Sequence, residues 1–348
     1  MPQINNFTMH QFRGIKDLTL QNLGNINIFV GLNNSGKTSI LEAIEIYCNP
    51  LKPLVLYSTS RRREIKSSRQ SILDTIKWLF PINNSEKKEI ILESDGDFPL
   101  RKYTAIYKEF SGINPENEEG LDLEKGGELL LKAKIYNEVQ EESFKIWENE
   151  GFIDKKNHKY VSLPVVTVNL MSHRIEQLQI SALSEALLQN FKLEIIELLQ
   201  IFEPEITDIE ILSPRGNIPE IYINHQQLGK CPLSIFGDGI RHLLHLALNL
   251  VKVQNGVLLI DELETAIHTG VLTKTFSWLV RWCTKMKVQI FLTTHSLETI
   301  DSLLDATELY TDLMLYRLEK KAGQIKVIKL EQERLKRIRE NLGLEVRL

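Results

Sequence analysis

The first half of the chain carries short apolar runs separated by polar turns, a spacing typical of β-strands. These runs predict strands over residues 4–12, 18–20, 26–30, 90–93, 102–107, 129–135 and 161–170. Apolar positions recur at helical spacing over 39–46 and 72–80, and the acidic, polar stretch 114–127 predicts an exposed loop. The pattern therefore predicts a β-rich N-terminal lobe with few helices.

The second half alternates helices with strands. Apolar positions over 183–202 recur at helical spacing and predict one amphipathic helix, which ends before Pro204. The other predicted elements are a strand pair at 209–212 and 220–224, a helix after the turn 237–239, strands at 257–260 and 288–292, a hairpin around Gly323 and a charged helix over 332–341. Continuous apolar strands between helices predict an α/β arrangement with parallel strands in its central sheet.

The segment Gly31-Leu32-Asn33-Asn34-Ser35-Gly36-Lys37-Thr38, between a predicted strand and a predicted helix, is a complete Walker A phosphate loop. Such a loop turns several backbone N–H groups toward one point at a helix N-terminus, where they meet the charge of a triphosphate. Lys37 is expected to reach the β- and γ-phosphates, and Thr38 to offer its hydroxyl to Mg²⁺. The predicted nucleotide-binding residues of this loop are Gly31, Asn33, Asn34, Ser35, Gly36, Lys37, Thr38 and Ser39.

Four apolar residues followed by two acids, Val257-Leu258-Leu259-Ile260-Asp261-Glu262, predict a Walker B strand. Open α/β sheets place their ligands at the carboxyl ends of such central strands. Asp261 is expected to hold Mg²⁺, directly or through water, and Glu262 to orient and deprotonate the attacking water. The alternative is a buried strand that merely ends in solvated acids.

A third apolar strand ends in Thr293-Thr294-His295-Ser296. A histidine at a strand end is more often structural than catalytic. Its position, roughly 30 residues after the Walker B acids, nevertheless matches the switch histidine of ABC-type ATPases, which contacts the γ-phosphate. His295 is therefore predicted to help set hydrolysis.

The turn Ser234-Ile235-Phe236-Gly237-Asp238-Gly239 precedes Arg241 and opens a predicted helix. Its two glycines allow a backbone to approach a phosphate closely. In ABC-type ATPases the signature motif occupies this place, so Ser234, Gly237, Asp238 and Gly239 are predicted to contact nucleotide. The alternative is a simple loop-to-helix turn.

The order of these motifs resembles the ATPase heads of the OLD, RecF and SMC group of ABC-type ATPases, in particular stand-alone AAA-type ATPases related to OLD nucleases. The resemblance is carried by Phe12-Arg13-Gly14-Ile15, the phosphate loop, the turn 237–239, Ile260 to Glu264 with His268, and Thr294-His295-Ser296. It implies an ABC-type P-loop NTPase head with a mixed and parallel central sheet, an N-terminal antiparallel β lobe and a short helical insertion. It also implies that two heads sandwich two ATP molecules, each supplying its signature turn to the other's nucleotide.

The resemblance adds two further candidate site residues and a division of the chain. Arg13 belongs to the first motif, and Gln70 is a candidate for the glutamine that senses Mg²⁺. We expect residues 1–348 to form a single head, in which 1–110 hold the β lobe with Walker A. Residues 111–228 would form a β and helical insertion region, and 229–348 would carry the signature, Walker B, the switch histidine and a C-terminal hairpin and helix.

Two departures from the family pattern matter. The signature is not Leu-Ser-Gly-Gly-Gln, because Gly237 stands where the serine normally stands and Ser234 lies three residues earlier. OLD nucleases carry a C-terminal Toprim domain, whereas only about 50 residues follow His295, so we expect none in this chain. A separately encoded nuclease or other effector, with a Toprim-like enzyme among the candidates, is the expected partner.

The composition of the chain limits the ligands and the cellular compartment that we expect for it. The chain has 348 residues, 43% of them hydrophobic, and a net charge of -4, so no overall basic field points to nucleic acid. The one dense basic run is Arg61-Arg62-Arg63 with Lys66 and Arg69, which is either a solvated face or a contact for nucleic acid or a partner. Three distant cysteines argue against a disulfide or metal framework. The absence of a leader-like segment or a membrane-length apolar run favours the cytoplasm and no membrane contact.

The predicted function is an ATP-binding and ATP-hydrolysing ABC-type ATPase with Mg²⁺. It would act as an ATP-gated switch, as a homodimer or higher oligomer, in anti-phage defence or DNA metabolism, with DNA as a candidate ligand. The alternative is a low-activity, ATP-dependent scaffold or sensor module that binds and regulates a partner. The predicted catalytic pair, Glu262 and His295, argues against that alternative. A third possibility is the ATPase subunit of a membrane transporter, and the Gly-Asp-Gly signature turn argues against it.

Overall fold

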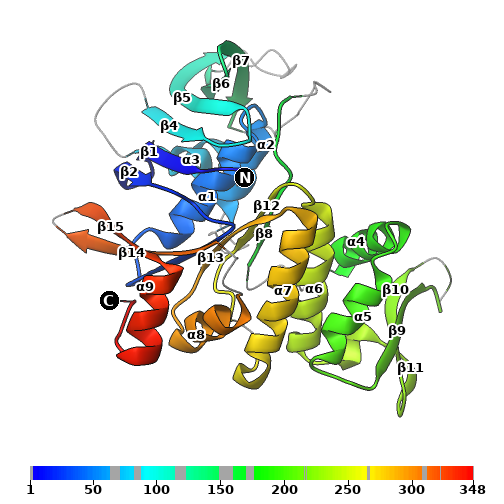
Figure 1. The fold of residues 1–348 in the computed structure, drawn as a ribbon. Coiled ribbons are helices and arrows are strands. Elements are labelled where there is room, and N and C mark those ends of the chain that lie inside the picture. Colours follow the sequence, from blue (N-terminus) through cyan, green and yellow to red (C-terminus); the bar gives the residue numbers. More distant parts are fainter. Residues whose placement is uncertain are drawn as a thin grey trace. The chain divides into compact units, whose positions relative to one another are not determined.

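The structure is a computed structural model that describes residues 3–62, 71–81, 88–113, 123–148, 160–169, 176–214, 216, 218–264, 267–307, 312–321 and 323–347. The chain divides into two compact units (Figure 1). The first unit contains Met1–Leu23, Leu32–Leu163 and Leu318–Ile328, and the second contains Gly24–Gly31, Pro164–Arg317 and Lys329–Leu348. The units are interleaved in sequence, and the division at residues 110 and 228 stays a prediction.

The first unit is built on an antiparallel sheet of six strands in the order β2-β1-β4-β5-β6-β7. The strands are β1 (Asn6–Phe12), β2 (Ile15–Leu20), β4 (Lys88–Asp95), β5 (Leu100–Ile113), β6 (Leu123–Ile135) and β7 (Glu138–Trp147). The sequence pattern missed β7 because its first half is fully exposed and rich in acids. Charged side chains of this kind are usual on the edge strand of a sheet. The predicted antiparallel β lobe is confirmed.

In its described residues the first unit also contains three helices, α1 (Lys37–Cys48), α2 (Pro53–Arg61) and α3 (Ile72–Lys77). Most of α1 is buried, and its Tyr47 ring packs edge-on against Phe7 of β1 with 5.4 Å between ring centroids. Ser71 caps α3 by accepting from the backbone N–H of Asp74 at 3.2 Å. The packing of α1 matters most, because the phosphate loop leads directly into this helix.

The central sheet of the second unit has the strand order β15-β14-β3-β13-β12-β8. Four neighbouring strands run parallel, namely β3 (Ile26–Gly31), β13 (Gln289–Thr293), β12 (Val257–Ile260) and β8 (Val165–Val168). Every residue of β3, β12 and β13 is buried, as expected for parallel strands covered on both faces. The α/β class and the mixed, partly parallel central sheet are confirmed.

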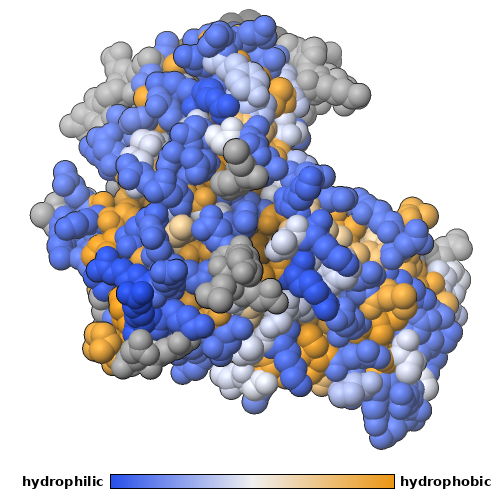
Figure 2. All heavy atoms as spheres, in the orientation of Figure 1, coloured by the Kyte–Doolittle hydropathy of each residue, from blue (hydrophilic) through white to orange (hydrophobic). Residues whose placement is uncertain are grey.

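Helices and a small antiparallel sheet surround these strands. The helices are α4 (Glu176–Leu188), α5 (Lys192–Gln200), α6 (Asp238–Lys252), α7 (Leu272–Met286) and α8 (Leu297–Ala306), and the small sheet joins β9 (Ile206–Leu212), β10 (Glu220–His225) and β11 (Gly229–Pro232). Both α4 and α5 pack on α6, and α7 packs on α8. On the face drawn in Figure 2, hydrophobic side chains gather over the helices of the second unit.

The prediction of one helix over 183–202 is wrong. Asn190 takes a left-handed conformation (φ 58°) between α4 and α5, and the N–H of Phe191 bonds back to the carbonyl of Ala186 at 2.9 Å. This closure is a common way to end a helix. The apolar spacing continues across the break because Leu183 and Leu199 enter the same core.

The C-terminal part contains β14 (Leu313–Lys321), β15 (Gln324–Glu331) and α9 (Gln332–Lys336), followed by a π-helical turn over Arg337–Asn341. The predicted hairpin at Gly323 is confirmed, and the predicted charged helix ends in this π turn. All three cysteines are free and buried. Among the described helices, none is long and apolar enough to cross a bilayer.

Candidate functional site

The phosphate loop connects the end of β3 to the start of α1. Gly31, Asn34 and Gly36 have positive φ values of 142°, 61° and 101°. Successive N–H groups in such a conformation can face the same side and form a concave site for an anion. Gly36 is also the N-cap of α1 and provides no side-chain cap for the helix, whose dipole favours negative charge at this end.

Two further features of the loop fit a bound phosphate. The Lys37 side chain is buried, and its Nζ donates to the carbonyl of Leu32 in the same loop at 3.1 Å. Within the described residues the Ser35 hydroxyl is buried and has no hydrogen-bond partner. Buried polar groups are normally paired, so the unpaired Ser35 hydroxyl is a group that a phosphate oxygen would complete.

Packing requires glycine at position 36. A Cβ at this position would lie 3.0 Å from Cδ1 of Ile325 and 3.5 Å from Cδ1 of Ile15. The φ of 101° would strain any side chain as well. The first unit therefore fixes the loop conformation at its last residue before α1.

Arg13, a candidate site residue from the first motif, lies in an ion pair. Its Nε is 2.8 Å from Oε2 of Glu42 on α1, and its Nη2 donates to Oε1 of the same carboxylate at 3.3 Å. The Glu42 side chain is fully buried, so this charge needs a cation next to it. The geometry favours a structural role for Arg13 in holding α1.

The carboxyl ends of β12 and β13 bring the Walker B acids together with Thr293. The Thr293 hydroxyl donates to Oδ1 of Asp261 at 2.6 Å and accepts from the backbone N–H of Glu262 at 2.9 Å. Glu262 has a positive φ of 58°, which is uncommon for a residue with a side chain and costs about 1 kcal/mol or more. One hydroxyl therefore fixes both the Asp261 carboxylate and the strained Glu262 backbone.

The predicted switch histidine, His295, lies two residues after the end of β13. The backbone N–H of His295 donates to Oε1 of Glu264 at 3.0 Å, and its carbonyl accepts from Nη1 of Arg347. Thr293, Glu264 and Arg347 have no role that was predicted from the sequence. Thr293 and Glu264 lie within the quoted motifs, whereas nothing in the local sequence singles out Arg347.

The signature turn is a 3₁₀ turn (Leu233–Ile235) followed by α6. Ser234, Gly237 and Asp238 are exposed, and the Ile235 side chain is 57% exposed. The Arg241 guanidinium donates to the Ser234 carbonyl and closes the turn. A Cβ on Gly237 would meet no atom within 4 Å, so the packing around this residue does not require a glycine.

Three further candidates from the sequence are His268, the basic run around Arg62, and Gln70. His268, quoted in the family motif, caps a 3₁₀ turn by accepting from the N–H of Gly270 at 3.1 Å. In the basic run, Arg62 forms an ion pair with Glu45 of α1, with Nη1 and Oε2 2.7 Å apart. Gln70, together with Arg63, Lys66 and Arg69, lies outside the described residues.

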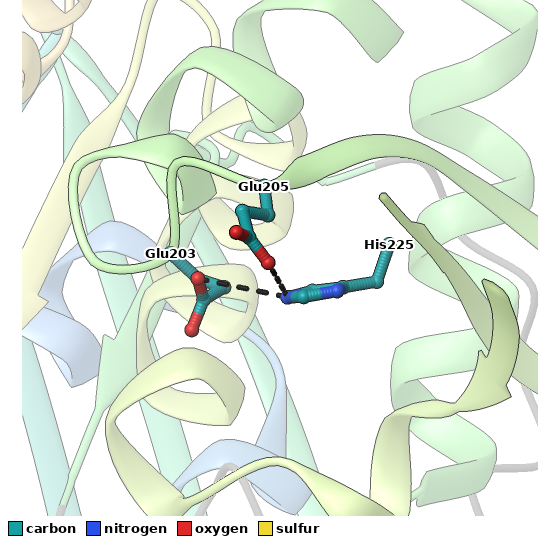
Figure 3. A group of neighbouring side chains, drawn as sticks. All are labelled: Glu203, Glu205 and His225. Carbon is teal, nitrogen blue, oxygen red and sulfur yellow. Dashed lines mark ion pairs between the residues drawn. The ribbon is translucent and has the colours of Figure 1, made fainter. Parts of the chain in front are cut away.

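Glu203, Glu205 and His225 form a cluster that resembles a metal site. Figure 3 shows both carboxylates turned toward Nε2 of His225, at 3.6 Å for Glu203 and 3.4 Å for Glu205. However, Nδ1 accepts from the backbone N–H groups of Gln227 and Leu228 at 3.3 and 3.2 Å. Nδ1 therefore keeps its lone pair and Nε2 carries the proton of the neutral ring. A metal would need the lone pair of Nε2, so we assign the cluster a structural role.

Mg²⁺ prefers oxygen ligands, and the predicted magnesium residues fit that preference. Thr38 offers a hydroxyl in the first turn of α1, and Asp261 offers a carboxylate after β12. The phosphate loop residues 32–38 belong to the first unit, and Asp261, Glu262 and His295 belong to the second.

Comparisons with known proteins agree with the motifs. A family model described as "AAA domain, putative AbiEii toxin, Type IV TA system" matches residues 26–301. An ATP/GTP phosphatase from Helicobacter pylori is 24% identical over 340 residues, covering 86% of this chain and 87% of that protein. The uncharacterized protein MJECL11 from Methanocaldococcus jannaschii is 35% identical over 114 residues, covering 32% of this chain and 98% of that protein.

Two solved structures share the fold. An SMC head bound to the C-terminal winged-helix domain of ScpA has a TM-score of 0.52 at 13% identity and covers 95% of this chain and 99% of that chain. An SMC head with an extended coiled coil, bound to the C-terminal domain of ScpA derived from Pyrococcus furiosus, has a TM-score of 0.51 at 12% identity. The match covers 99% of this chain and 100% of that chain.

Proposed function

This chain belongs to the AAA domain family that matches residues 26–301 and is an ATPase of the ABC type, and we propose that its ATP-bound dimer is a conformational switch. Within that family we place it with the stand-alone ATPases related to OLD nucleases. The observation that supports the hydrolysis step of this switch is the Thr293 hydroxyl, which ties Asp261 to the backbone of Glu262. This arrangement fixes the Asp261 carboxylate and the backbone position from which the Glu262 side chain starts.

In the proposed reaction each motif has its own role. Lys37 and the loop N–H groups bind the phosphates, and Thr38 and Asp261 hold Mg²⁺, which neutralises phosphate charge when bound. Glu262 accepts a proton from the attacking water, and His295 contacts the γ-phosphate. Glu262 lies just after β12 and is exposed, which suits a base that must reach water.

The proposed dimer uses the signature turn. Each subunit would offer residues 234–239, most of which are exposed, to the nucleotide of the other subunit. Two observations support this contact: the open space around Gly237 and the exposed Ile235 side chain, which leave polar backbone and apolar surface available to a partner. Because the γ-phosphate would touch both subunits, ATP would favour the closed dimer and hydrolysis would release it.

The proposed setting is antiviral defence or DNA metabolism with a separately encoded nuclease or other effector. The family description, which names a toxin of a toxin–antitoxin system, supports a defence role. SMC heads of the same fold bind ScpA, which supports a protein partner for this head. A DNA contact through the basic run is less well supported, because Arg62 is neutralised by Glu45.

Two substitutions test the hydrolysis roles. We expect Lys37→Ala to abolish ATP binding in equilibrium titrations. We expect Glu262→Gln to bind ATP, to hydrolyse it at least about 100-fold more slowly and to accumulate dimers, because the general base is lost. Glu333→Gln on exposed α9 is the control for the same chemical change. Wild-type turnover by Glu262→Gln would refute the general-base role of Glu262, whereas negligible turnover by the wild-type protein itself would favour the scaffold alternative, in which ATP binding alone regulates a partner.

A second experiment tests the dimer. Gly237 has extended backbone angles (φ -65°, ψ 165°) that any residue can adopt, so Gly237→Trp should leave the monomer folded. In the Glu262→Gln background we expect this side chain to block the ATP-dependent dimer in light scattering while ATP binding persists. Gly237→Ala, with one added carbon, should have a weaker effect. An unchanged dimer in the tryptophan variant would remove the signature turn from the interface.

A further inference from the structure

The C-terminal segment 339–347, which we call the strap, reaches the switch histidine from a position distant in sequence. We propose that Arg347 of the strap is a positioning residue for His295. By donating to the main-chain carbonyl of His295, it sets the position of the His295 side chain. This inference rests on the proposed role of His295 in hydrolysis. The strap and the switch loop both belong to the second unit.

Two charged side chains hold the backbone of His295 from both sides. Glu264 accepts from its N–H at 3.0 Å, and the Arg347 guanidinium donates to its carbonyl through Nη1. His295 is half-buried, and both the N–H and the carbonyl of the backbone that carries its imidazole are hydrogen-bonded. Hydrogen bonds that involve a charged group are stronger than neutral ones, so this backbone position is well defined.

Arg347 is itself held in one orientation. Its Nε and Nη2 donate to the two carboxylate oxygens of Glu345 at 2.8 and 2.7 Å. This two-bond pair uses one edge of the planar guanidinium and leaves Nη1 for His295. The same hydrogen bonds lower the pKa of Glu345 to about 2, so the carboxylate stays charged at neutral pH.

The strap is fastened at both ends. Val346, between Glu345 and Arg347, is buried in the core of the second unit. Arg339 pairs with Asp301 of α8 through Nε and Nη2, both at 2.7 Å, and its Nη1 donates to the Leu344 carbonyl at 2.6 Å. Figure 1 shows α9, which precedes Arg339, beside α8.

The switch loop therefore lies between fixed points. β13 ends at Thr293, and Ser296 caps α8 by accepting from the N–H of Thr299 at 3.1 Å. His295 lies on the short connection between these two elements. Since small displacements of a reacting group cost much rate, loss of the Arg347 bond should lower hydrolysis without lowering ATP affinity.

The test compares Arg347→Gln with wild type and with Arg337→Gln, a control that removes an exposed arginine from the π turn. We expect Arg347→Gln to lower kcat by about 10- to 100-fold while ATP affinity stays close to wild type and Tm falls no further than in Glu345→Gln, which breaks the same pair. Arg347→Lys can still donate to the carbonyl but cannot form the two-bond pair, so we expect partial rescue. Equal kcat for the Arg347→Gln and Arg337→Gln variants would overturn the proposal.

A second readout separates this inference from the proposed function. The imidazole resonance of His295, assigned among the eight histidines with His295→Gln, reports the position of its ring without catalysis. We expect it to shift in Arg347→Gln and to stay in place in Arg337→Gln. If His295→Gln hydrolyses ATP like wild type, the role of His295 fails, whereas an unmoved resonance in Arg347→Gln refutes the positioning by Arg347.

Discussion

The substitution Thr293→Val tests the contact on which the proposed hydrolysis site depends. Valine keeps the β-branched shape of threonine and replaces only the hydroxyl, so it opens no cavity at this position, which is 1% exposed. The lost group donates to the Asp261 carboxylate at 2.6 Å and accepts from the Glu262 N–H at 2.9 Å. The variant therefore removes hydrogen bonds without changing packing.

The expected cost follows from these two bonds. A hydrogen bond to a charged acceptor contributes about 1.5–3 kcal/mol to the free energy of unfolding. The second bond is neutral and its donor belongs to an exposed residue, Glu262, so its contribution is smaller. We therefore expect the free energy of unfolding to fall by about 1.5–3 kcal/mol, and kcat to fall by about tenfold or more as Asp261 and Glu262 loosen.

Urea denaturation followed by tryptophan fluorescence measures the first effect, since Trp278 and Trp282 lie on α7 in the same unit. The matched control is Thr275→Val, also on α7. Its hydroxyl is buried without a hydrogen-bond partner in the described part of the chain, so this change should leave stability equal or higher. If the Thr293 and Thr275 variants unfold at the same urea concentration, the bridging role of Thr293 is refuted.

Three further outcomes are expected. Gly36→Ala should weaken ATP binding and lower Tm, because its φ of 101° strains any side chain; wild-type affinity in a binding titration would contradict the loop geometry. Arg13→Ala should cost about 3–5 kcal/mol of unfolding free energy by leaving buried Glu42 without its cation, and the double variant with Glu42→Gln should regain part of that loss. The pKa of Glu345 is lowered from 4.5 to about 2 by its bonds with Arg347, so the pair stabilises the fold fully above about pH 4.5 and is lost as the pH falls through about 2. The Tm difference between wild type and Glu345→Gln should therefore shrink in acid, and a difference that grows there would contradict this sign.

Local sequence was sufficient wherever a structure depends on neighbouring residues. The phosphate loop needs a strand, glycines in left-handed conformations and a helix start within a short segment, and the structure has this order from β3 to α1. The buried strand β12 followed by Asp261 is equally local. The apolar runs likewise predicted the strands of the first unit, except for its acidic edge strand β7, whereas their antiparallel arrangement was implied by the family resemblance.

Local sequence failed where one residue interrupted a regular pattern. The apolar spacing over 183–202 is that of a single helix, but Asn190 reverses the chain between α4 and α5. Both helices face the same core, so the hydrophobic pattern contains no sign of the break. Asparagine tolerates the left-handed conformation, yet most asparagines do not adopt it, and only the packing of the two helices selects it here.

By itself, the sequence predicted a nucleotide site at Lys37 and Thr38, and it determined that the central strands are parallel and buried. Only the tertiary structure decided which side chains hold the predicted catalytic groups: Thr293 meets Asp261, and Arg347 meets His295. It also paired Arg13 with Glu42. The physical reason is that periodicity and turn chemistry act over a few residues, whereas these contacts join residues 29 to 52 positions apart and form only when the sheet and its helices are packed.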